Sequence, residues 1–312
     1  MKGEGDADSY HVPVLVEEVM TYLTQGGDGL YLDGTLGGGG HAFALLSACP
    51  GCCLLGIDRD PEALARAQIR LAPFEARVRL LLGSFLDAVD DPQVRGEGLA
   101  GALLDLGVSS HQLDHDRRGF SMRPGLSLDM RMGQDGATAA DYLASASEAA
   151  LLQDLRSGDA PRPRALARSI VARRGRRPLA VSDDLVGVLE SVLGRPATHS
   201  EKARVFQAVR IAVNEELAVL EEALPALRDA LNPGGVLVVL SYHSGEDASV
   251  KRMFHTWSDP GRGIPPKVPL RQHEMSALGE TLTRKPVLAG PAEVAANPRS
   301  RPARLRAWRK AA

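Results

Sequence analysis

Short apolar segments alternate with helix-like segments along the first hundred residues. Val78–Leu82 reads VRLLL and Leu99–Leu106 reads LAGALLDL, and such brief aliphatic runs are typical of strands buried on both faces. Pro61 begins a segment rich in Ala, Leu and Arg, as proline does at the first position of a helix. This alternation predicts a parallel α/β sheet. Two further strands are expected earlier in the chain. One ends at Tyr31–Leu32, and the other comprises Cys53–Ile57.

The alternation stops after Gly107, and helical patterns continue to about residue 201. Lys202–Ala230 is then predicted as one long amphipathic helix, because apolar residues recur at three- and four-residue spacing. Val236–Leu240 is the clearest strand, and Gly279–Leu288 with Ala303–Trp308 are expected to close the sheet as an antiparallel edge pair. The helices expected before residue 201 are Ala139–Leu155, Ala165–Arg174 and Ser182–Leu193. The expected parts are a core over 1–110 and 202–312, interrupted by a helical insertion over 111–201.

The composition is that of a globular chain with little net charge. Of 312 residues, 44% are hydrophobic and 24% charged, and the net charge is −2. The charges are unevenly distributed, since eight arginines lie between Arg156 and Arg177, and six basic residues without an acid lie between Arg299 and Lys310. Such stretches favour contact with a phosphate backbone, although solvated helix faces would also account for them. Aromatic residues make up only 4%, which argues against a broad base-stacking platform.

The three cysteines, Cys49, Cys52 and Cys53, lie in one short loop before a strand. Three thiols cannot form a balanced disulfide framework, and no second Cys/His cluster nearby completes a zinc site. We therefore expect free thiols in a reducing cytoplasm, and no metal site. The N-terminal MKGEGDADSY lacks an apolar signal core, and no apolar run approaches about 18 residues, so no membrane contact is expected.

The segment YLDGTLGGGGH at 31–41 predicts a strand-to-helix turn that lets a ligand touch bare backbone. Gly37–Gly40 lack the Cβ atoms that block positive φ and close approach, and a helix beginning near His41 would offer its N-terminal amides. Asp33 decides the class of ligand. A carboxylate here would repel the pyrophosphate of a dinucleotide, but it would attract the sulfonium and ammonium groups of S-adenosylmethionine (SAM).

Polar or small residues follow each predicted strand, where open α/β sheets bind their ligands. Asp58 is placed to accept hydrogen bonds from ribose hydroxyls, and Phe85 to cover an adenine. Asp105, Ser241 and His243 are the candidate catalytic residues, because an amine that is to be methylated needs a hydrogen-bond acceptor on its N–H. A core role for Phe85 and a structural role for His243 remain open.

Taken together, nine segments resemble the RsmH (MraW) methyltransferase family. They are HVPVL (11–15), DGTLGGGGH (33–41), IDRDPEAL (57–64), LDLGVSSHQLD (104–114), RGFS (118–121), LDMRM (128–132), FQAVRIAVNEEL (206–217), GGVLVVLSYHSGED (234–247) and NPRSR (297–301). The resemblance implies an α/β fold with a Rossmann-like class I SAM-dependent methyltransferase sheet and an inserted helical domain. It also implies SAM-dependent N4-methylation of a cytosine in the decoding centre of 16S rRNA.

Carried over residue by residue, the resemblance implies the SAM contacts Gly39, Gly40, His41, Asp58, Phe85, Asp105 and Gln112. The chain also departs from the family. Many relatives read S-F-H-S-L-E-D where residues 241–247 here read SYHSGED, and relatives often carry Gly-Glu-Glu where residues 157–161 read SGDAP. The proline usual near the start of the Phe206 helix is absent.

The expected partner is 16S rRNA in the small ribosomal subunit or its precursor, with monomer and homodimer both open. We expect direct, in-line methyl transfer without a covalent base adduct, because the cysteines lie on the wrong strand for such an attack. The candidate phosphate contacts are Arg162, Arg164, Arg168, Arg173, Arg174, Arg176 and Arg177.

Three other functions remain open. One is a SAM-dependent methyltransferase acting on DNA amines or a protein amide, although the chain lacks the Pro-Pro-aromatic motif of the DNA enzymes. Another is an NAD-dependent oxidoreductase, which Asp33 and the missing Lys/Tyr pattern disfavour. The third is a ribosome-assembly factor that keeps SAM as a structural ligand, since binding residues alone do not require turnover.

Overall fold

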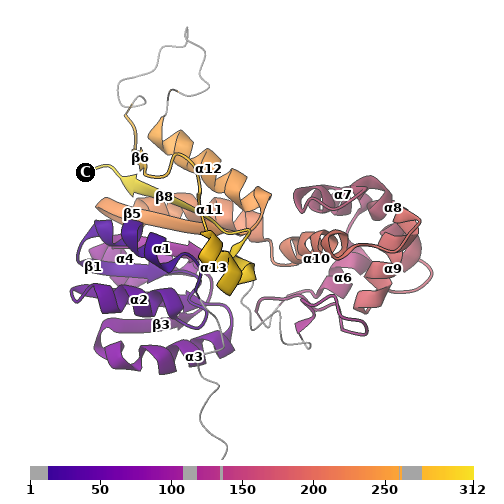
Figure 1. Cartoon of the computed structure of the whole chain (residues 1–312), viewed down its shortest axis with the longest axis horizontal. Helices are drawn as coiled ribbons and strands as arrows, with labels where there is room; N and C mark the ends of the chain where they lie inside the picture. Colours follow the sequence, from indigo (N-terminus) through magenta and orange to yellow (C-terminus); the bar gives the residue numbers. More distant parts are fainter. Residues whose placement is uncertain (1–12, 108–117, 134–135, 260, 262–275) are drawn as a thin grey trace, which may run out of the picture. The chain divides into compact units, whose positions relative to one another are not determined.

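The computed structural model of this protein describes residues 13–107, 118–133, 136–259, 261 and 276–312. The chain divides into two compact units (Figure 1). One unit comprises Met1–Gly107 and Val219–Ala312, and the other comprises Val108–Ala218. The first contains the sheet, and the second is helical in its described part. The helical unit therefore extends to residue 218, beyond the boundary expected at residue 201.

An eight-stranded sheet forms the centre of the first unit, with strand order β3-β2-β1-β4-β5-β8-β6 and with β7 also paired to β8. The first five strands are parallel to their neighbours, while β8 is antiparallel to β5. The chain order reverses between β1 and β4, which is the topological switch point of a Rossmann-like sheet. The predicted fold class is thereby confirmed. The strands are β1 (Gly29–Asp33), β2 (Cys52–Asp58), β3 (Val78–Leu82), β4 (Leu99–Asp105), β5 (Leu231–Ser241), β6 (Gly279–Thr281), β7 (Val287–Leu288) and β8 (Arg304–Lys310).

Helices cover both faces of this sheet (Figure 1). One face packs against α1 (Val16–Leu23), α2 (Gly40–Ala48) and α3 (Pro61–Leu71). The other packs against α4 (Pro92–Glu97), α11 (Glu216–Ala230) and α12 (Ser244–Ser258). Among the described residues, this unit also contains α13 (Pro291–Ala296) and the 3-10 turns η1 (Thr24–Gly26), η2 (Ala72–Arg77), η3 (Asp87–Asp90) and η6 (Pro298–Ser300). No helix in the described part of the chain is long and apolar enough to cross a bilayer.

The sheet has one apolar core on each face, and successive side chains of a strand contribute alternately to the two cores. Tyr31 of β1 belongs to the first core, whereas its neighbours Leu30 and Leu32 belong to the second. The same holds at β5, where Val238 and Val239 face opposite sides. Because successive side chains of a strand point to opposite faces, a sheet covered on both sides needs apolar residues at consecutive positions. This explains why the central predicted strands, such as Val236–Leu240, read as unbroken apolar runs.

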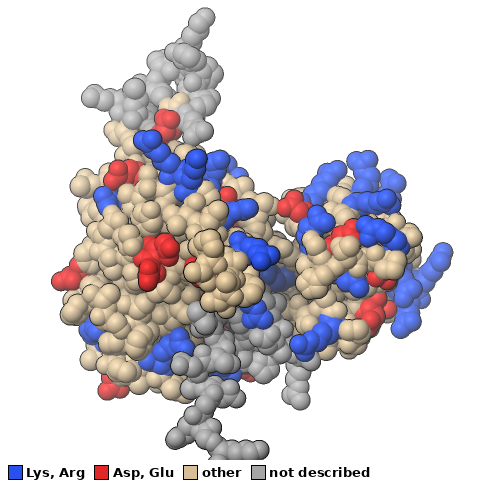
Figure 2. Space-filling model, in the orientation of Figure 1, with Lys and Arg blue, Asp and Glu red and all other residues tan. Residues whose placement is uncertain are grey.

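The second unit has a core of its own, built from α6 (Ala139–Ser145), α7 (Glu148–Ser157), α8 (Pro163–Arg174), α9 (Ser182–Leu193) and α10 (His199–Val213). The predicted bounds of α9 are confirmed. The helix predicted over Ala139–Leu155 is instead two helices, because Ser147 begins a new one and accepts a hydrogen bond from the Ala150 amide. Basic side chains are prominent on the face of this unit that Figure 2 shows, over α7 and α8.

The single helix predicted over Lys202–Ala230 is wrong, since α10 ends at Val213 and α11 begins at Glu216. Asn214 explains the break. Its side chain donates to the Met130 carbonyl and accepts from the Met132 amide, both at 2.8 Å. The next residue, Glu215, has φ of 51°, a left-handed conformation that interrupts helical hydrogen bonding. A tertiary contact therefore overrides a continuous apolar periodicity.

The antiparallel closing strands are present, but the segment predicted as one strand over Gly279–Leu288 is divided into β6 and β7. Both pair with β8 on its outer side. Between them, the Thr283 hydroxyl accepts a hydrogen bond from the Ala307 amide at 3.0 Å. A buried side-chain oxygen thus replaces a backbone carbonyl in the ladder, which is why strand pairing is interrupted there.

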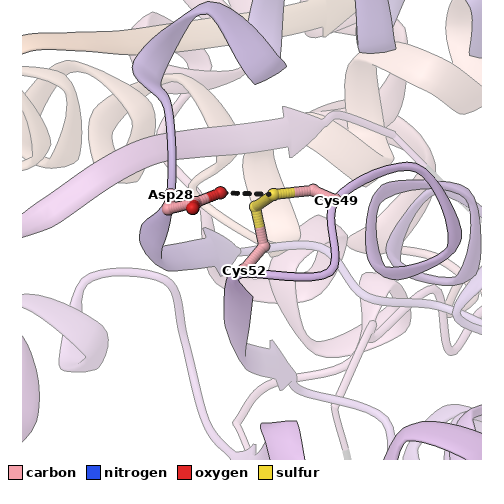
Figure 3. Close-up of side chains that lie close together, drawn as sticks. All are labelled: Asp28, Cys49 and Cys52. Carbon is pink, nitrogen blue, oxygen red and sulfur yellow. Dashed lines mark hydrogen bonds between the residues drawn. A yellow bond between two sulfur atoms is a disulfide. The ribbon is translucent and has the colours of Figure 1, made fainter.

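The expectation of three free thiols is also wrong, because Cys49 and Cys52 form a disulfide (Figure 3). Cys53 is free. A turn brings the pair together, since the Cys52 amide donates to the Cys49 carbonyl and the two Cα atoms lie 5.4 Å apart. That separation is within the range that a disulfide spans. An odd number of cysteines therefore did not prevent a local pair from forming.

Candidate functional site

The glycine-rich segment after β1 forms a tight turn that leads directly into α2. Gly37 and Gly39 have φ of 51° and 74°, a conformation that residues with a Cβ rarely adopt. Gly39 precedes the helix and Gly40 begins it. A Cβ at Gly40 would lie 2.9 Å from Cγ of Pro13, so the N-terminal segment packs on bare backbone here. The turn therefore presents backbone amides at a helix N-terminus, where a ligand can approach closely.

Asp33, the last residue of β1, is only 3% exposed. Its Oδ1 accepts one hydrogen bond, from the Thr35 amide at 3.2 Å. Burial raises the pKa of Asp33 to about 7; His41 and the Thr35 amide oppose this shift, whereas Asp105 and Asp58 add to it. An ionised carboxylate with so little compensation is costly to bury. A cationic ligand beside Asp33 would relieve that cost, whereas a pyrophosphate would increase it.

Asp58, the last residue of β2, is tied to the same turn. Its Oδ2 accepts from the Gly37 amide at 2.7 Å, and its Oδ1 accepts from the Asp60 amide at 2.9 Å. Burial raises the pKa of the Asp58 carboxyl, and these two backbone donors oppose the shift. The carboxylate therefore joins the carboxyl end of β2 to the glycine turn.

Tyr242 holds the Asp105 carboxylate, and the His41 ring lies beside it. His41 Nε2 lies 2.8 Å from the Val14 carbonyl, so that nitrogen carries the hydrogen. Its Nδ1 lies 3.7 Å from Asp105 Oδ2. The Tyr242 hydroxyl donates to Asp105 Oδ1 at 2.8 Å, and burial together with the negative Asp105 raises the pKa of Tyr242 well above its usual value. Asp105 is thereby fixed at the carboxyl end of β4, beside the start of α2.

Phe85 follows β3, is half-buried and packs against the second core of the sheet. Gly34 allows it to approach the turn, because a Cβ at position 34 would lie 2.7 Å from Phe85 Cβ and 2.6 Å from Cδ2 of Leu104. The neighbouring Thr35 hydroxyl accepts a hydrogen bond from the Asp105 amide at 2.5 Å. The ends of β1, β3 and β4 are therefore locked together around the glycine turn.

Ser241 and His243 are engaged with backbone groups. The buried Ser241 hydroxyl donates to the Arg304 carbonyl of β8 at 3.3 Å. His243 caps α12, where its Nδ1 accepts from the amides of Gly245 and Glu246 at 3.2 and 3.4 Å. Since Nδ1 accepts, Nε2 carries the hydrogen, and it lies 3.2 Å from Glu246 Oε1. Both residues thus anchor the end of β5 and the start of α12.

The structure brings most of the predicted residues to one edge of the sheet, at the carboxyl ends of the parallel strands. These are Asp33, Gly39, Gly40, His41, Asp58, Phe85 and Asp105, with Ser241 at the end of the adjacent strand β5 and His243 just after it. Gln112 lies outside the described residues. Thr35 and Tyr242 were not among the predicted site residues, although both bond to Asp105. Both lie within the motifs that resemble the family. Tyr242 stands where many relatives have Phe, and this difference was the signal in the sequence that could have drawn attention to it.

Comparison with known proteins establishes the family. The family model described as MraW methylase family matches residues 8–311. The chain belongs to the MraW methylase family. A protein of Gemmatimonas aurantiaca named Ribosomal RNA small subunit methyltransferase H is 48% identical over 311 residues, which cover 98% of this chain and 97% of that protein.

Proteins with the same name from other organisms match this MraW family member over similar lengths. The one from Heliobacterium mobile is 44% identical, covering 96% of this chain and 99% of its own length. The one from Chlorobium phaeovibrioides is 45% identical, covering 98% of both. Membership of a methylase family confirms the predicted class of enzyme, a methyltransferase that uses SAM.

Proposed function

We propose that this MraW family protein methylates the exocyclic N4 amine of a cytosine in the decoding centre of 16S rRNA. The observation that carries the proposal is the Asp105 carboxylate at the end of β4, which accepts a hydrogen bond from Tyr242 and lies next to His41 beside the glycine turn. An acceptor in that position suits an amine that must direct its lone pair at a methyl group. The relatives named as small-subunit rRNA methyltransferases support the choice of RNA as substrate.

The residues present fit SAM. The left-handed glycines leave room for a ligand against the α2 N-terminus, and Asp33 is a buried carboxylate suited to a cation. We assign Asp33 and the turn at Gly39 and Gly40 to the methionine part, Asp58 to the ribose and Phe85 to the adenine. When bound, SAM supplies an electrophilic methyl group.

Asp105 is the residue that we propose to accept a hydrogen bond from the N4 amine. This bond draws the amine lone pair out of conjugation with the ring and towards the methyl group. Ser241 and His243 already bond to backbone groups of β8 and α12, and we assign them positioning roles, which keep Tyr242 next to Asp105. The N–C bond forms as the C–S bond breaks, and the methylated ammonium then releases its extra proton to water.

The helical unit is the proposed RNA-binding part. Of its candidate arginines, Arg174 donates to the carbonyls of Leu143 and Ala146, so its guanidinium is structural. Arg173 pairs with Asp184. Arg164, Arg176 and Arg177 are exposed, and we propose them as phosphate contacts, because exposed guanidinium groups bind phosphate at little desolvation cost. Because the proposed substrate is ribosomal RNA, the protein is expected to act in the cytoplasm.

The decisive experiment is transfer of labelled methyl from SAM to small ribosomal subunits from cells that lack this enzyme. Nuclease mapping and mass analysis then locate the product. An N4-methylated cytosine in the decoding centre is the expected result. Methylation of another base would refute the substrate assignment while keeping the SAM site. SAM binding without transfer to any subunit or precursor would favour the assembly-factor alternative.

A second experiment separates RNA contacts from structural arginines. The triple variant Arg164→Gln, Arg176→Gln, Arg177→Gln should weaken RNA binding and reduce its salt slope by about two to three, with SAM affinity unchanged. Lys202→Gln is the matched control, because it removes a cation of the same unit that is already paired with Glu190. An unchanged salt slope in the triple variant would remove these residues from the interface.

A further inference from the structure

Three potential metal ligands converge at the edge of the sheet opposite the glycine turn. Figure 3 shows Asp28, Cys49 and Cys52 directed toward one another. One ligand atom from each lies within 4.8 Å of the other two. Asp28 precedes β1, Cys49 follows α2 and Cys52 begins β2. The strands β1 and β2 thus carry this cluster at their amino ends, and Asp33 and Asp58 at their carboxyl ends.

We propose that the reduced Cys49–Cys52 pair, together with Asp28, binds a thiophilic divalent cation such as Zn²⁺, and that the disulfide is the metal-free, oxidised form of the same site. Two thiolates and a carboxylate are a ligand set that zinc accepts, with a fourth position open to water.

The surrounding backbone holds the ligands in place without the disulfide. Gly29 pairs with Cys52 in the β1–β2 ladder, which fixes Asp28 beside Cys52. The Arg77 guanidinium donates to the carbonyls of Cys49 and Cys52, each at 2.9 Å, and to those of Leu46 and Pro50. These hydrogen bonds hold the turn between the cysteines, so both ends of the turn stay in place when the disulfide is reduced.

The geometry suits a tetrahedral ion. Cys49 Sγ lies 3.5 Å from Asp28 Oδ1. Metal–sulfur and metal–oxygen bonds of about 2.3 and 2.0 Å at a tetrahedral angle place sulfur and oxygen about 3.5 Å apart. Gly51 permits this approach, because a Cβ there would lie 2.4 Å from the Asp28 carboxylate. After reduction, the two sulfurs need only separate to about 3.8 Å, the corresponding edge of the tetrahedron.

The charges also balance. Two thiolates and one carboxylate carry three negative charges, a divalent cation leaves one, and the adjacent Arg77 guanidinium offsets it. By contrast, a disulfide across a sequence separation of 3 restricts the unfolded chain less than one that closes a longer loop. The pair is thus poorly explained as a stabilising cross-link.

Both steps of the conversion balance. A dithiol reductant transfers two electrons and two protons to the disulfide, which becomes two thiols while the reductant becomes a disulfide. Binding of the cation then releases the two thiol protons. Cys49 is half-buried and Cys52 is fully buried, so the reductant attacks at Cys49.

The test is a titration of the full-length protein with Co²⁺ and Zn²⁺, after anaerobic reduction and removal of the reductant. Thiolate-to-cobalt charge-transfer absorption and competition with a chromophoric chelator report binding. The reduced protein should bind one ion per chain, and the disulfide form none. Asp28→Asn should weaken binding at least tenfold, and Cys49→Ser should abolish the charge-transfer band of a two-thiolate site.

Cys53→Ser is the matched control, since it removes the third cysteine and leaves the ligand set intact. It should bind as the parent does. Absence of bound metal in protein with three titratable thiols would overturn the proposal, and so would an Asp28→Asn variant that binds like the parent. Because Asp28 is exposed, that variant keeps the test valid even if a cysteine variant fails to fold, and retained circular dichroism confirms its fold.

Discussion

Asp33 should make cofactor binding depend on pH in the neutral range. Burial raises the pKa of this carboxyl to about 7, so near neutrality a large fraction of the free protein carries a protonated Asp33. We have assigned Asp33 to the cationic methionine part of SAM, and only the ionised carboxylate attracts that part. SAM should therefore bind the ionised form selectively and release a proton as it binds.

The magnitude follows from the ionised fraction. With a pKa of about 7, roughly 0.1 of the molecules are ionised at pH 6 and roughly 0.75 at pH 7.5, and the apparent Kd scales with the inverse of that fraction. The affinity for SAM should thus rise about eightfold from pH 6 to pH 7.5. At pH 7, binding should release about half a proton.

Isothermal titration calorimetry at these pH values measures the Kd, and buffers of different ionisation enthalpy count the protons. Asp33→Asn is the matched variant, because it keeps the shape and removes the titration. Its affinity should be weaker than that of the parent at pH 7.5 and should lose most of the pH dependence. Methylthioadenosine, which lacks the cationic part, tests whether the dependence arises instead at Asp58.

The reasoning is refuted if the affinity of the parent for SAM is constant from pH 6 to pH 7.5. It is refuted equally if Asp33→Asn keeps the slope of the parent, or if methylthioadenosine shows that slope. In the last case, the titrating group would be Asp58, whose pKa is also raised by burial.

Three further outcomes are expected. Ionisation of the buried Asp33 carboxyl opposes folding, so the stability of the ligand-free protein should fall as pH rises from about 4 to about 7. At pH 8, Asp33→Asn removes this cost and should raise the free energy of unfolding by up to about 4 kcal/mol, measured by urea denaturation. Tyr242→Phe removes the hydrogen bond to Asp105. It should slow methyl transfer about tenfold and lower the stability by about 0.5–1.5 kcal/mol; an unchanged rate would show that Asp105 needs no such donor. Arg174→Ala leaves the carbonyls of Leu143 and Ala146 without their donor and should cost about 1–3 kcal/mol, whereas Arg164→Ala should change stability by less than about 0.5 kcal/mol.

Local patterns were sufficient to predict the parallel strands and the edge of the sheet where the candidate site residues lie. Val78–Leu82 and Ser182–Leu193 form the expected elements with the expected bounds, because burial on both faces and helical periodicity are properties of consecutive residues. The glycine turn was predictable for the same reason. Once strands are parallel and enter from one side, Asp33, Asp58 and Asp105 must end at the same edge.

Tertiary contacts decided the remaining features, since they join residues far apart in the chain. Apolar spacing over 202–230 is continuous, yet Asn214 bonds to backbone at 130–132 and divides the helix. The bond from Tyr242 to Asp105 spans 137 residues, so neither motif alone could predict it.

The cysteine cluster shows the same division. Its spacing made a local pair possible, whereas the third potential ligand, Asp28, arrives only because β1 and β2 pair in parallel at Gly29 and Cys52. The sequence by itself determined where most strands and helices lie and which chemical groups follow the strands, because local burial and backbone preference govern both. Only the folded chain decided which of those groups meet, because their distances depend on strand register and packing.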